Sequence, residues 1–416
     1  MPDAPTPDSS AKSPLHLHRY RQRRDRLARA LITAGGIGVL MAVLAIGVFL
    51  AVEVIPLFFP SDDLPSETAP RLTLSMLWQP QPYGDNLEYR WLPYRLEESG
   101  TPYVSLVPLA WGTLEAAAWA LVLAVPLALG AAIHSSLYMS RHLRTRIKPT
   151  LELMEAMPSV VLGFIAGLVL GPWVELHLAM ALMTVLLLPL GVLCLAGARR
   201  CLPGGWRLAL SLRWASLWLI PWLLLLVWLA HWLAPLFEDW WFGGDLRLWI
   251  ETWLGWDVEA RNALILGLAM GFAVMPGIYA LAEDALVDVP RGLSDGAQAM
   301  GATRWQTLTR VVLPVAWPGI FSAMMIGAGR AVGETMIVLM ASGNTALMSA
   351  NPLDGLRSLA SSIAIELPEA GPGGTHYRLL LLAALALFLF TFLVNTLAEL
   401  VRTRLRRRFR IVRSDP

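Results

Sequence analysis

The chain has 416 residues, of which 56% are hydrophobic and 15% are charged. Soluble domains carry about 45–50% apolar and about 25% charged residues, so this composition excludes an ordinary soluble protein and indicates surfaces that face lipid. The 33 basic and 31 acidic residues leave a formal net charge of +2, which identifies no partner until the position of each sign along the chain is considered.

Eight apolar blocks are long enough to cross a bilayer. The hydrocarbon core is about 30 Å thick and a helix rises about 1.5 Å per residue, so a span needs about 20 mostly apolar residues. The blocks are residues 30–59, 106–133, 156–173, 177–197, 212–236, 262–283, 318–342 and 378–400. The third is short and contains Pro158 and Gly163, which predicts a bent or partly re-entrant segment. The sequence therefore predicts an all-α, polytopic membrane protein with about eight transmembrane helices.

Arginine clusters predict the orientation of these spans, because positive charge in short loops marks the cytoplasmic side of a membrane. Arginines are frequent in residues 19–29, which places the N-terminus inside. If the spans alternate, the inside segments are 134–155, 198–211, 284–317 and the tail from 401, and all of them are basic. The outer loops, 60–105, 237–261 and 343–377, carry more acidic residues and fewer arginines. Both termini are therefore expected in the cytoplasm.

The spans divide the chain into segments. Residues 1–29 are expected to be a disordered, basic N-terminus, followed by the first transmembrane helix at 30–59, an outer loop at 60–105, a transmembrane domain at 106–400 and a basic tail at 401–416. The transmembrane domain includes the 284–317 loop. We expect the tail to contact anionic lipid headgroups rather than nucleic acid.

Several kinds of site have no sequence motif here. A Walker A loop needs a lysine preceded by glycine and followed by serine or threonine, and neither Lys12 nor Lys148 has this context. No zinc-binding, hydrolase or dinucleotide-binding motif is present. The sequence therefore predicts no catalytic residue, no metal ligand and no cofactor bound by this chain.

The 284–317 loop carries the most informative pattern. A short helix is expected from Ser294, a natural N-cap, to Met300, with Gly301 supplying the left-handed turn that ends it. A second amphipathic segment then runs to Pro314, which we expect to stop or kink the chain. Its apolar side consists of Trp305, Leu308, Val311 and Val312. Such a projecting pair of helices presents an apolar ridge to a partner's groove.

The spacing in this loop resembles the EAA loop of ABC importer permeases. In that family Glu-Ala-Ala is followed after three residues by Gly, and after nine more by Ile-x-Leu-Pro. Here Asp295 replaces the Glu, Gly296 the first Ala and Val311 the Ile, while the acidic charge and both spacings are kept. The resemblance implies that the loop docks into an ATP-binding subunit through Asp295, Gly296, Ala297, Gly301, Val311, Leu313 and Pro314. A chance amphipathic connector is the alternative.

The seventh block contains two charged residues, Arg330 and Glu334. A charge inside a span costs at least about 2.5–3.5 kcal/mol on insertion scales, so such residues are candidates for function. On one helix, residues four apart share a face, so we expect Arg330 and Glu334 to pair. A guanidinium also suits a tetrahedral oxyanion, whereas a self-neutralising pair that only locks helices together is the alternative. The predicted substrate pathway comprises Arg330, Glu334, Thr335 and Ser159, although Ser159 could instead only cap a broken helix with Pro158.

The stretch Gly329–Met336, Gly-Arg-Ala-Val-Gly-Glu-Thr-Met, resembles the permeases of the phosphate-specific transport system. Residues Ala131–Tyr138, Met157–Gly163 and Leu359–Pro368 resemble the same family, and the Thr-Met after Glu334 is more similar to its PstC-type than to its PstA-type subunit. The resemblance implies a type I importer core, similar to MetI, of six spans. The 177–236 region adds two more spans, to which we assign no role.

The resemblance also implies the partners. They are a second, PstA-type permease subunit, a dimer of PstB-type ATP-binding subunits and a periplasmic phosphate-binding protein. The chain would lie in the cytoplasmic (inner) membrane and carry inorganic phosphate, with ATP bound by its partners. Two alternatives stay open: a permease for another oxyanion or small solute, and a membrane scaffold that senses phosphate. A secondary transporter is disfavoured, because the two halves show no inverted repeat.

Overall fold

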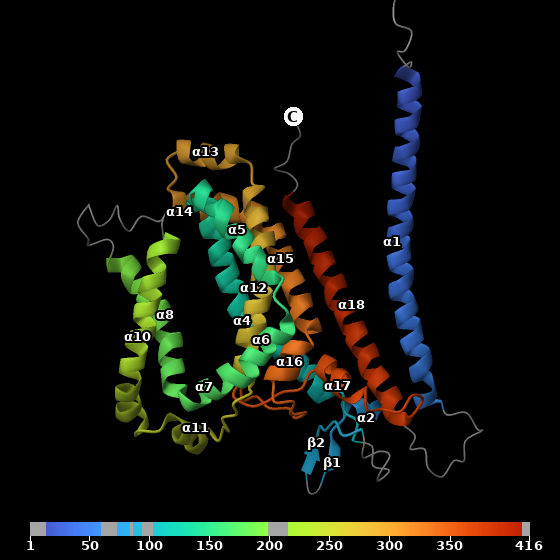
Figure 1. Cartoon of the computed structure of the whole chain (residues 1–416), viewed down its shortest axis with the longest axis vertical. Coiled ribbons are helices and arrows are strands. Elements are labelled where there is room, and N and C mark those ends of the chain that lie inside the picture. Colours follow the sequence, from blue (N-terminus) through green and yellow to red (C-terminus); the bar gives the residue numbers. More distant parts are fainter. Residues whose placement is uncertain (1–13, 60–72, 84–85, 94–102, 199–214, 410–416) are drawn as a thin grey trace, which may run out of the picture.

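The computed structural model describes residues 14–59, 73–83, 86–93, 103–198 and 215–409. Within these ranges eight helical stretches are long and apolar enough to cross a membrane, which confirms the predicted all-α, polytopic architecture. The long helices stand roughly parallel to one another, and shorter elements lie at their two ends (Figure 1).

The helices follow the predicted blocks with shifted ends. The long helices are α1 (Pro14–Phe58), α4 (Val107–Ile133), α8 (Leu178–Ala198), α10 (Ala215–Phe242), α12 (Ala263–Val287), α15 (Leu313–Gly333) and α18 (Thr375–Phe409). The shorter helices are α2 (Leu74–Trp78), α5 (Arg141–Glu155), α6 (Ser159–Phe164), α7 (Gly171–Leu176), α11 (Leu246–Leu254), α13 (Arg291–Ala299), α14 (Arg304–Thr307), α16 (Met336–Ala341) and α17 (Leu359–Glu366). The π-helical turns η1 (His134–Tyr138), η2 (Ile165–Leu170) and η4 (Leu308–Val312) continue helices, and β1 (Gln81–Tyr83) pairs antiparallel with β2 (Asn86–Glu88).

The first helix begins earlier than the sequence analysis expected. Helix α1 runs from Pro14, so residues 14–29 are helical rather than disordered. Arginine, leucine and alanine are good helix formers, and they extend the membrane helix beyond its apolar part. Residues 1–13 lie outside the described ranges.

Helices α4 and α12 form the centre of the molecule. Small side chains on α4 repeat every four residues and are fully buried at Ala120, Ala124, Ala128 and Ala132. In the facing helix α12, a Cβ added at Gly267 would collide with Trp119 of α4. Small residues let helices approach closely in lipid, where no hydrophobic force drives them together. As a result 61% of the most apolar window of α12 is buried, against 11% for α1.

The third span is one helix that begins after a bend. Pro158 is the N-cap of α6 and has extended backbone, and the chain then continues through η2 and α7 to Leu176 without interruption. Gly163 therefore lies within an unbroken helix, whereas a bend or a partly re-entrant segment was expected from Pro158 and Gly163. It instead allows close packing, because a Cβ there would lie 3.0 Å from the carbonyl oxygen of Met336.

The seventh span is broken near its end, although a continuous span to residue 342 was expected. Helix α15 ends at Gly333, and Glu334 follows with extended backbone at φ −70° and ψ 126°. The short helix α16 then begins at Met336 and packs against α6. The break places Glu334 and Thr335 in a linker between two helices.

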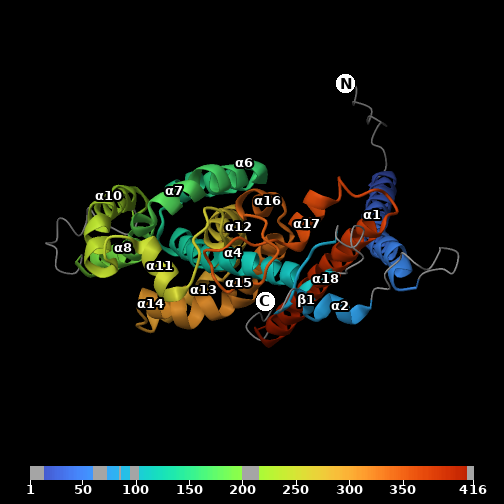
Figure 2. The ribbon, with the colours of Figure 1, turned by 90° about the horizontal axis from the view of Figure 1, so that it is seen from below.

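The two additional spans, α8 and α10, form a separate hairpin. They have their own buried cluster, which includes Met183 and Ala230. The indole nitrogen of Trp222 donates a hydrogen bond of 3.2 Å to the carbonyl oxygen of Gly191 and joins the two helices. The hairpin reaches the rest of the fold through α7 and α11 and lies at one side of the molecule (Figure 2). The predicted inside loop of this hairpin is 198–211, and residues 199–214 lie outside the described ranges.

The short elements separate the molecule into two ends. Helix α13 lies at the same end as the first residues of α1 and the last residues of α18 (Figure 1). The β1–β2 hairpin, α11 and α17 lie toward the opposite end. The 284–317 loop, the start of α1 and the end of α18 therefore lie on the same side of the molecule. The arginine pattern predicts that these three segments share one side.

Candidate functional site

Arg330 pairs with Glu155, a residue that the sequence analysis did not select. Nη1 of Arg330, in the last turn of α15, donates a hydrogen bond of 2.7 Å to Oε1 of Glu155, the last residue of α5. The two side chains are 39% and 45% exposed in the isolated chain. Gly277 of α12 lies beside the pair, since a Cβ there would be 3.2 Å from Oε1 of Glu155. Three helices thus meet at one accessible ion pair.

The expected pair between Arg330 and Glu334 is wrong. The four-residue spacing brings two side chains together only on a continuous helix. Here α15 ends at Gly333, and among the described residues Glu334 has no ion-pair partner. Thr335, the next residue, donates a long hydrogen bond of 3.4 Å from Oγ1 to the carbonyl oxygen of Gly333.

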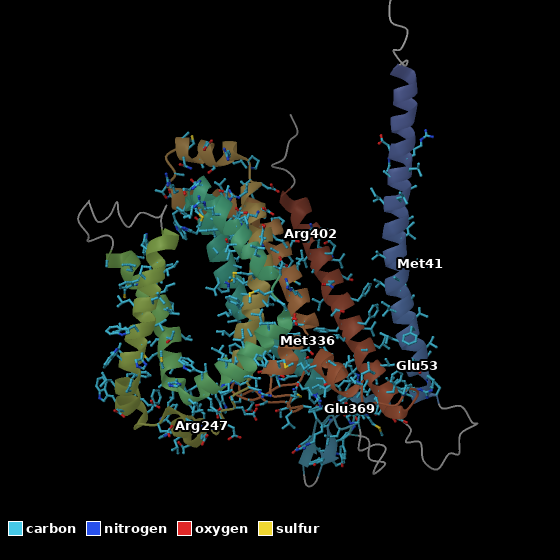
Figure 3. All side chains as sticks on the ribbon, viewed as in Figure 1. Met41, Glu53, Arg247, Met336, Glu369 and Arg402 are labelled. Carbon is cyan, nitrogen blue, oxygen red and sulfur yellow. The ribbon has the colours of Figure 1, made fainter. Side chains whose placement is uncertain are left out.

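Ser159 lies near Glu334 and Thr335 because the helices that adjoin these residues pack on each other. Ser159 is the first residue of α6, four positions after Glu155, and the N-cap before it makes no side-chain hydrogen bond. Helix α6 packs on α16, which follows Glu334 and Thr335. Met336, the first residue of α16, lies between the two ends of the molecule rather than at either end (Figure 3). The α5–α6 bend and the α15–α16 break therefore form one neighbourhood at mid-depth of the fold.

The first part of the 284–317 loop has the predicted turn but a different helix start. Helix α13 begins at Arg291 after Pro290, so Ser294 is inside the helix and is not its N-cap. Proline before the first turn supplies the extended backbone that precedes a helix and displaces the expected cap. Gly301 has φ +88°, which confirms the left-handed turn. Asp295 and Gly296 are exposed and Ala297 is half-buried.

The second part of the loop continues directly into α15. Thr303 caps α14 with a capping box to Gln306, and the helix then runs through η4 and past Pro314 without stopping. Proline is tolerated in this position because it lies in the first turn of α15. Leu308 and Val312 are 2% and 3% exposed and anchor this segment in the core.

Two large apolar side chains are exposed on the loop. Met300 is 90% exposed and Trp305 is 67% exposed, so Trp305 does not join the buried side as the sequence analysis expected. Val311 and Leu313 are half-buried. Methionine is flexible and tryptophan is large, and both are frequent in interfaces between proteins. The loop is therefore held in the core by Leu308 and Val312 and exposes the apolar side chains of Met300 and Trp305.

A second ion-pair group lies between α5 and α12. Glu283 of α12 is fully buried and contacts both Arg144 and Lys148 of α5. Nζ of Lys148 also lies 2.5 Å from Oδ1 of Asp284. Burial alone would lower the pKa of Lys148, but its hydrogen bonds to Asp284 and Glu283 outweigh this and raise the pKa to about 12. The sequence did not lead us to predict this group, although the adjacent acidic residues Glu283 and Asp284 at the end of an apolar block could have indicated it.

At the opposite end, Glu366 ties three segments together. Its carboxylate lies 3.0 Å from Arg357 and 3.0 Å from His376, and Oε1 accepts a hydrogen bond of 3.2 Å from the indole of Trp91. His376 is therefore part of a polar cluster. Trp91 is 1% exposed, so this cluster fixes part of the 60–105 loop on α17 and α18.

Comparison with known proteins places most of the chain in one family. Residues 124–411 match the model of the binding-protein-dependent transport system inner membrane component. The phosphate transport system permease protein PstC 1 of Mycobacterium tuberculosis is 28% identical over 300 residues, which cover 71% of this chain and 72% of that protein. PstC of Haemophilus influenzae is 28% identical over 319 residues, or 77% and 80% of the two chains. The probable ABC transporter permease protein YqgH of Bacillus subtilis is 31% identical over 144 residues, or 34% and 47%.

Proposed function

The chain belongs to the family of binding-protein-dependent transport system inner membrane components, and from this premise we propose that it is a permease subunit of an ATP-driven importer of inorganic phosphate. Several relatives that align with more than two thirds of the chain carry the name of phosphate transport permeases. The eight apolar helices agree with a multi-pass membrane protein.

The observation that carries the substrate class is the accessibility of Arg330 within the span region. An arginine there is costly unless it has a partner or a function. Among the described residues, the guanidinium donates a hydrogen bond only to Glu155, so its other donors are open, and the side chain is 39% exposed. A guanidinium presents donors in a fixed fork that matches the oxygens of a tetrahedral oxyanion. Arg330 would therefore bind phosphate in passage, with Ser159, Glu334 and Thr335 as further residues of the pathway.

The 284–317 loop would receive the mechanical input. The chain has no nucleotide-binding motif, so ATP would bind to a dimer of partner subunits of the PstB type. A groove on these subunits would hold the exposed Met300 and Trp305. The buried Leu308 and Val312 would connect this contact to α15, which carries Arg330 in its last turn. For this cycle to run, ATP must favour one state of the complex over the other.

The exposed faces of the chain are compatible with the remaining partners that we propose. Arg330, Glu155 and Met336 are all exposed in the isolated chain. A PstA-type permease subunit would cover this face and complete the pathway. A periplasmic phosphate-binding protein would deliver phosphate at the end that carries α11 and α17. This orientation puts both termini and the 284–317 loop in the cytoplasm, with the chain in the cytoplasmic membrane.

The test is uptake by the complete complex in proteoliposomes. The chain is produced with its second permease and ATP-binding subunits, and the loaded external binding protein is supplied outside the vesicles. We expect ATP-dependent accumulation of phosphate, with sulfate and molybdate not accumulated. Accumulation of sulfate or molybdate but not phosphate would move the chain to another oxyanion. A complex that assembles but accumulates no oxyanion would contradict the transport function.

A further inference from the structure

Glu155 occupies one of the guanidinium donors of Arg330 that an anionic substrate could also use. Its carboxylate oxygen lies 2.7 Å from Nη1, which is the distance of a charge-assisted hydrogen bond. A carboxylate and a phosphate offer the same kind of oxygen acceptor to a guanidinium. Both side chains are more than one third exposed, so another anion has access to the arginine.

The pair differs from the ion pairs that hold the helices together. Glu283 is fully buried and contacts two basic side chains of α5 at once. Among the described residues, Glu155 has only Arg330 as an ion-pair partner, and the pair joins two exposed side chains. An accessible pair of this kind contributes little to stability, so an incoming anion can replace Glu155 at little cost.

Helix α5 links this carboxylate to the 284–317 loop. Lys148 of α5 binds Glu283 and Asp284 in the last turn of α12, shortly before α13 begins. Glu155 lies on the same helix, about two turns further along. Pro149 follows Lys148 without interrupting α5. A displacement of the end of α12 would therefore move the α5 segment that carries Glu155.

We propose that Glu155 is the exchangeable counter-ion of Arg330. It neutralises the arginine while the pathway is empty and gives way when phosphate arrives. When the 284–317 loop moves, the end of α12 and the whole of α5 move with it. Glu155 then returns to Arg330, and the phosphate is released. This inference rests on the proposed function. It assigns Glu155 a positioning role, because the carboxylate acts on the substrate through Arg330.

The first test measures phosphate binding by the purified complex of permease and ATP-binding subunits, without the external binding protein. In Glu155→Gln the arginine loses its competing anion. We expect phosphate to bind about fivefold or more tightly, the lower range of typical coupling between sites, and the maximal uptake rate to fall because release becomes slow. Glu155→Asp keeps the charge and should bind phosphate as the wild type does. Glu152→Gln, one turn earlier on α5 with its carboxylate 4.0 Å from Lys148, is the matched control and should change neither value.

A double variant shows whether Glu155 acts through the arginine. Arg330→Gln with Glu155→Gln should bind phosphate as weakly as Arg330→Gln alone, since coupled residues are not additive. Unchanged affinity in Glu155→Gln, or tighter binding that persists without Arg330, would overturn the inference. Poor recovery of the Glu155→Gln complex together with normal affinity in the recovered fraction would also overturn it, in favour of a purely structural pair.

A third test addresses the link through α5. Lys148→Met should leave phosphate affinity unchanged but lower the number of phosphate ions carried per ATP hydrolysed. An unchanged ratio would overturn the part of the inference that concerns α5. If the wild-type complex carries no phosphate, the proposed function fails. If it carries phosphate and Glu155→Gln behaves as the wild type, only the present inference fails.

Discussion

Arg330 and Glu155 are separated by 175 positions in the sequence, yet their side chains form a hydrogen bond of 2.7 Å at the junction of α5, α12 and α15. The pair connects the α5–α6 bend with the helix that leaves the 284–317 loop. At this pair the accessible Arg330 meets α5, the helix that we propose to link the 284–317 loop to the substrate pathway. The first prediction therefore concerns the arginine.

Arg330→Gln should abolish phosphate uptake while the complex still assembles, because glutamine has no charge to attract an oxyanion. Arg330→Lys keeps the charge without the fork of donors and should retain a minor part of the uptake rate. Uptake and co-purification of the partner subunits are measured together. Arg402→Gln is a matched control, since Arg402 pairs with Glu399 near the end of α18, and it should not affect transport. Loss of assembly in Arg330→Gln would show that the pair only holds helices together.

Gly301→Val should disturb the 284–317 loop through its backbone. Gly301 has φ +88°, and no atom lies within 4 Å of an added Cβ, so strain and not a collision is the cause. A β-branched residue in left-handed backbone costs at least about 1–2 kcal/mol. We expect normal membrane insertion but ATP hydrolysis that is no longer coupled to uptake. Gly292→Ala, in the open first turn of α13, should keep coupling. Tight coupling in Gly301→Val would exclude this turn from the transmission path.

Trp305→Ala should weaken binding of the ATP-binding subunits without destabilising the chain. Trp305 is 67% exposed, so its removal leaves no cavity inside this protein. Buried tryptophans are frequent hot spots in interfaces, where truncation costs about 2 kcal/mol or more. The measurement is the affinity of the purified ATP-binding subunits for the permease in detergent. Trp253→Ala is the control, because Trp253 is 77% exposed on α11, toward the other end. Equal loss of affinity in both variants would indicate a general effect of tryptophan removal.

The sequence predicted what depends on composition and local pattern. Eight blocks, the relative placement of the ends and the left-handed turn at Gly301 follow from apolar length, arginine position and the backbone freedom of glycine. The Arg330–Glu334 pair failed because helical spacing assumes an unbroken helix, and the chain leaves the helix at Glu334. Glu155 could not be found, since no local pattern links two residues that only tertiary packing brings together. Ser294 was mistaken for a cap because Pro290 starts the helix earlier.

Gly167→Ala should destabilise the neighbourhood of Arg330 from a distance. Gly167 lies in η2, and a Cβ there would collide with the backbone carbonyl of Met340 in α16. Backbone cannot rotate away as a side chain does, so the helix carrying Gly167 must move away from α16. Overpacking of this kind typically costs about 1–3 kcal/mol. We expect a lower midpoint of thermal unfolding in detergent and slower uptake.

The matched control for this variant is Gly130→Ala on α4. No atom lies within 4 Å of a Cβ at Gly130, so the added methyl group meets open space. Alanine also favours a helix over glycine by about 1 kcal/mol, so this variant should be as stable as the wild type or slightly more stable. If Gly167→Ala matched Gly130→Ala in both stability and uptake, η2 and α16 would not need their close contact. The α5–α6 bend could then move independently of the α15–α16 break, and the Arg330 neighbourhood would not act as one unit.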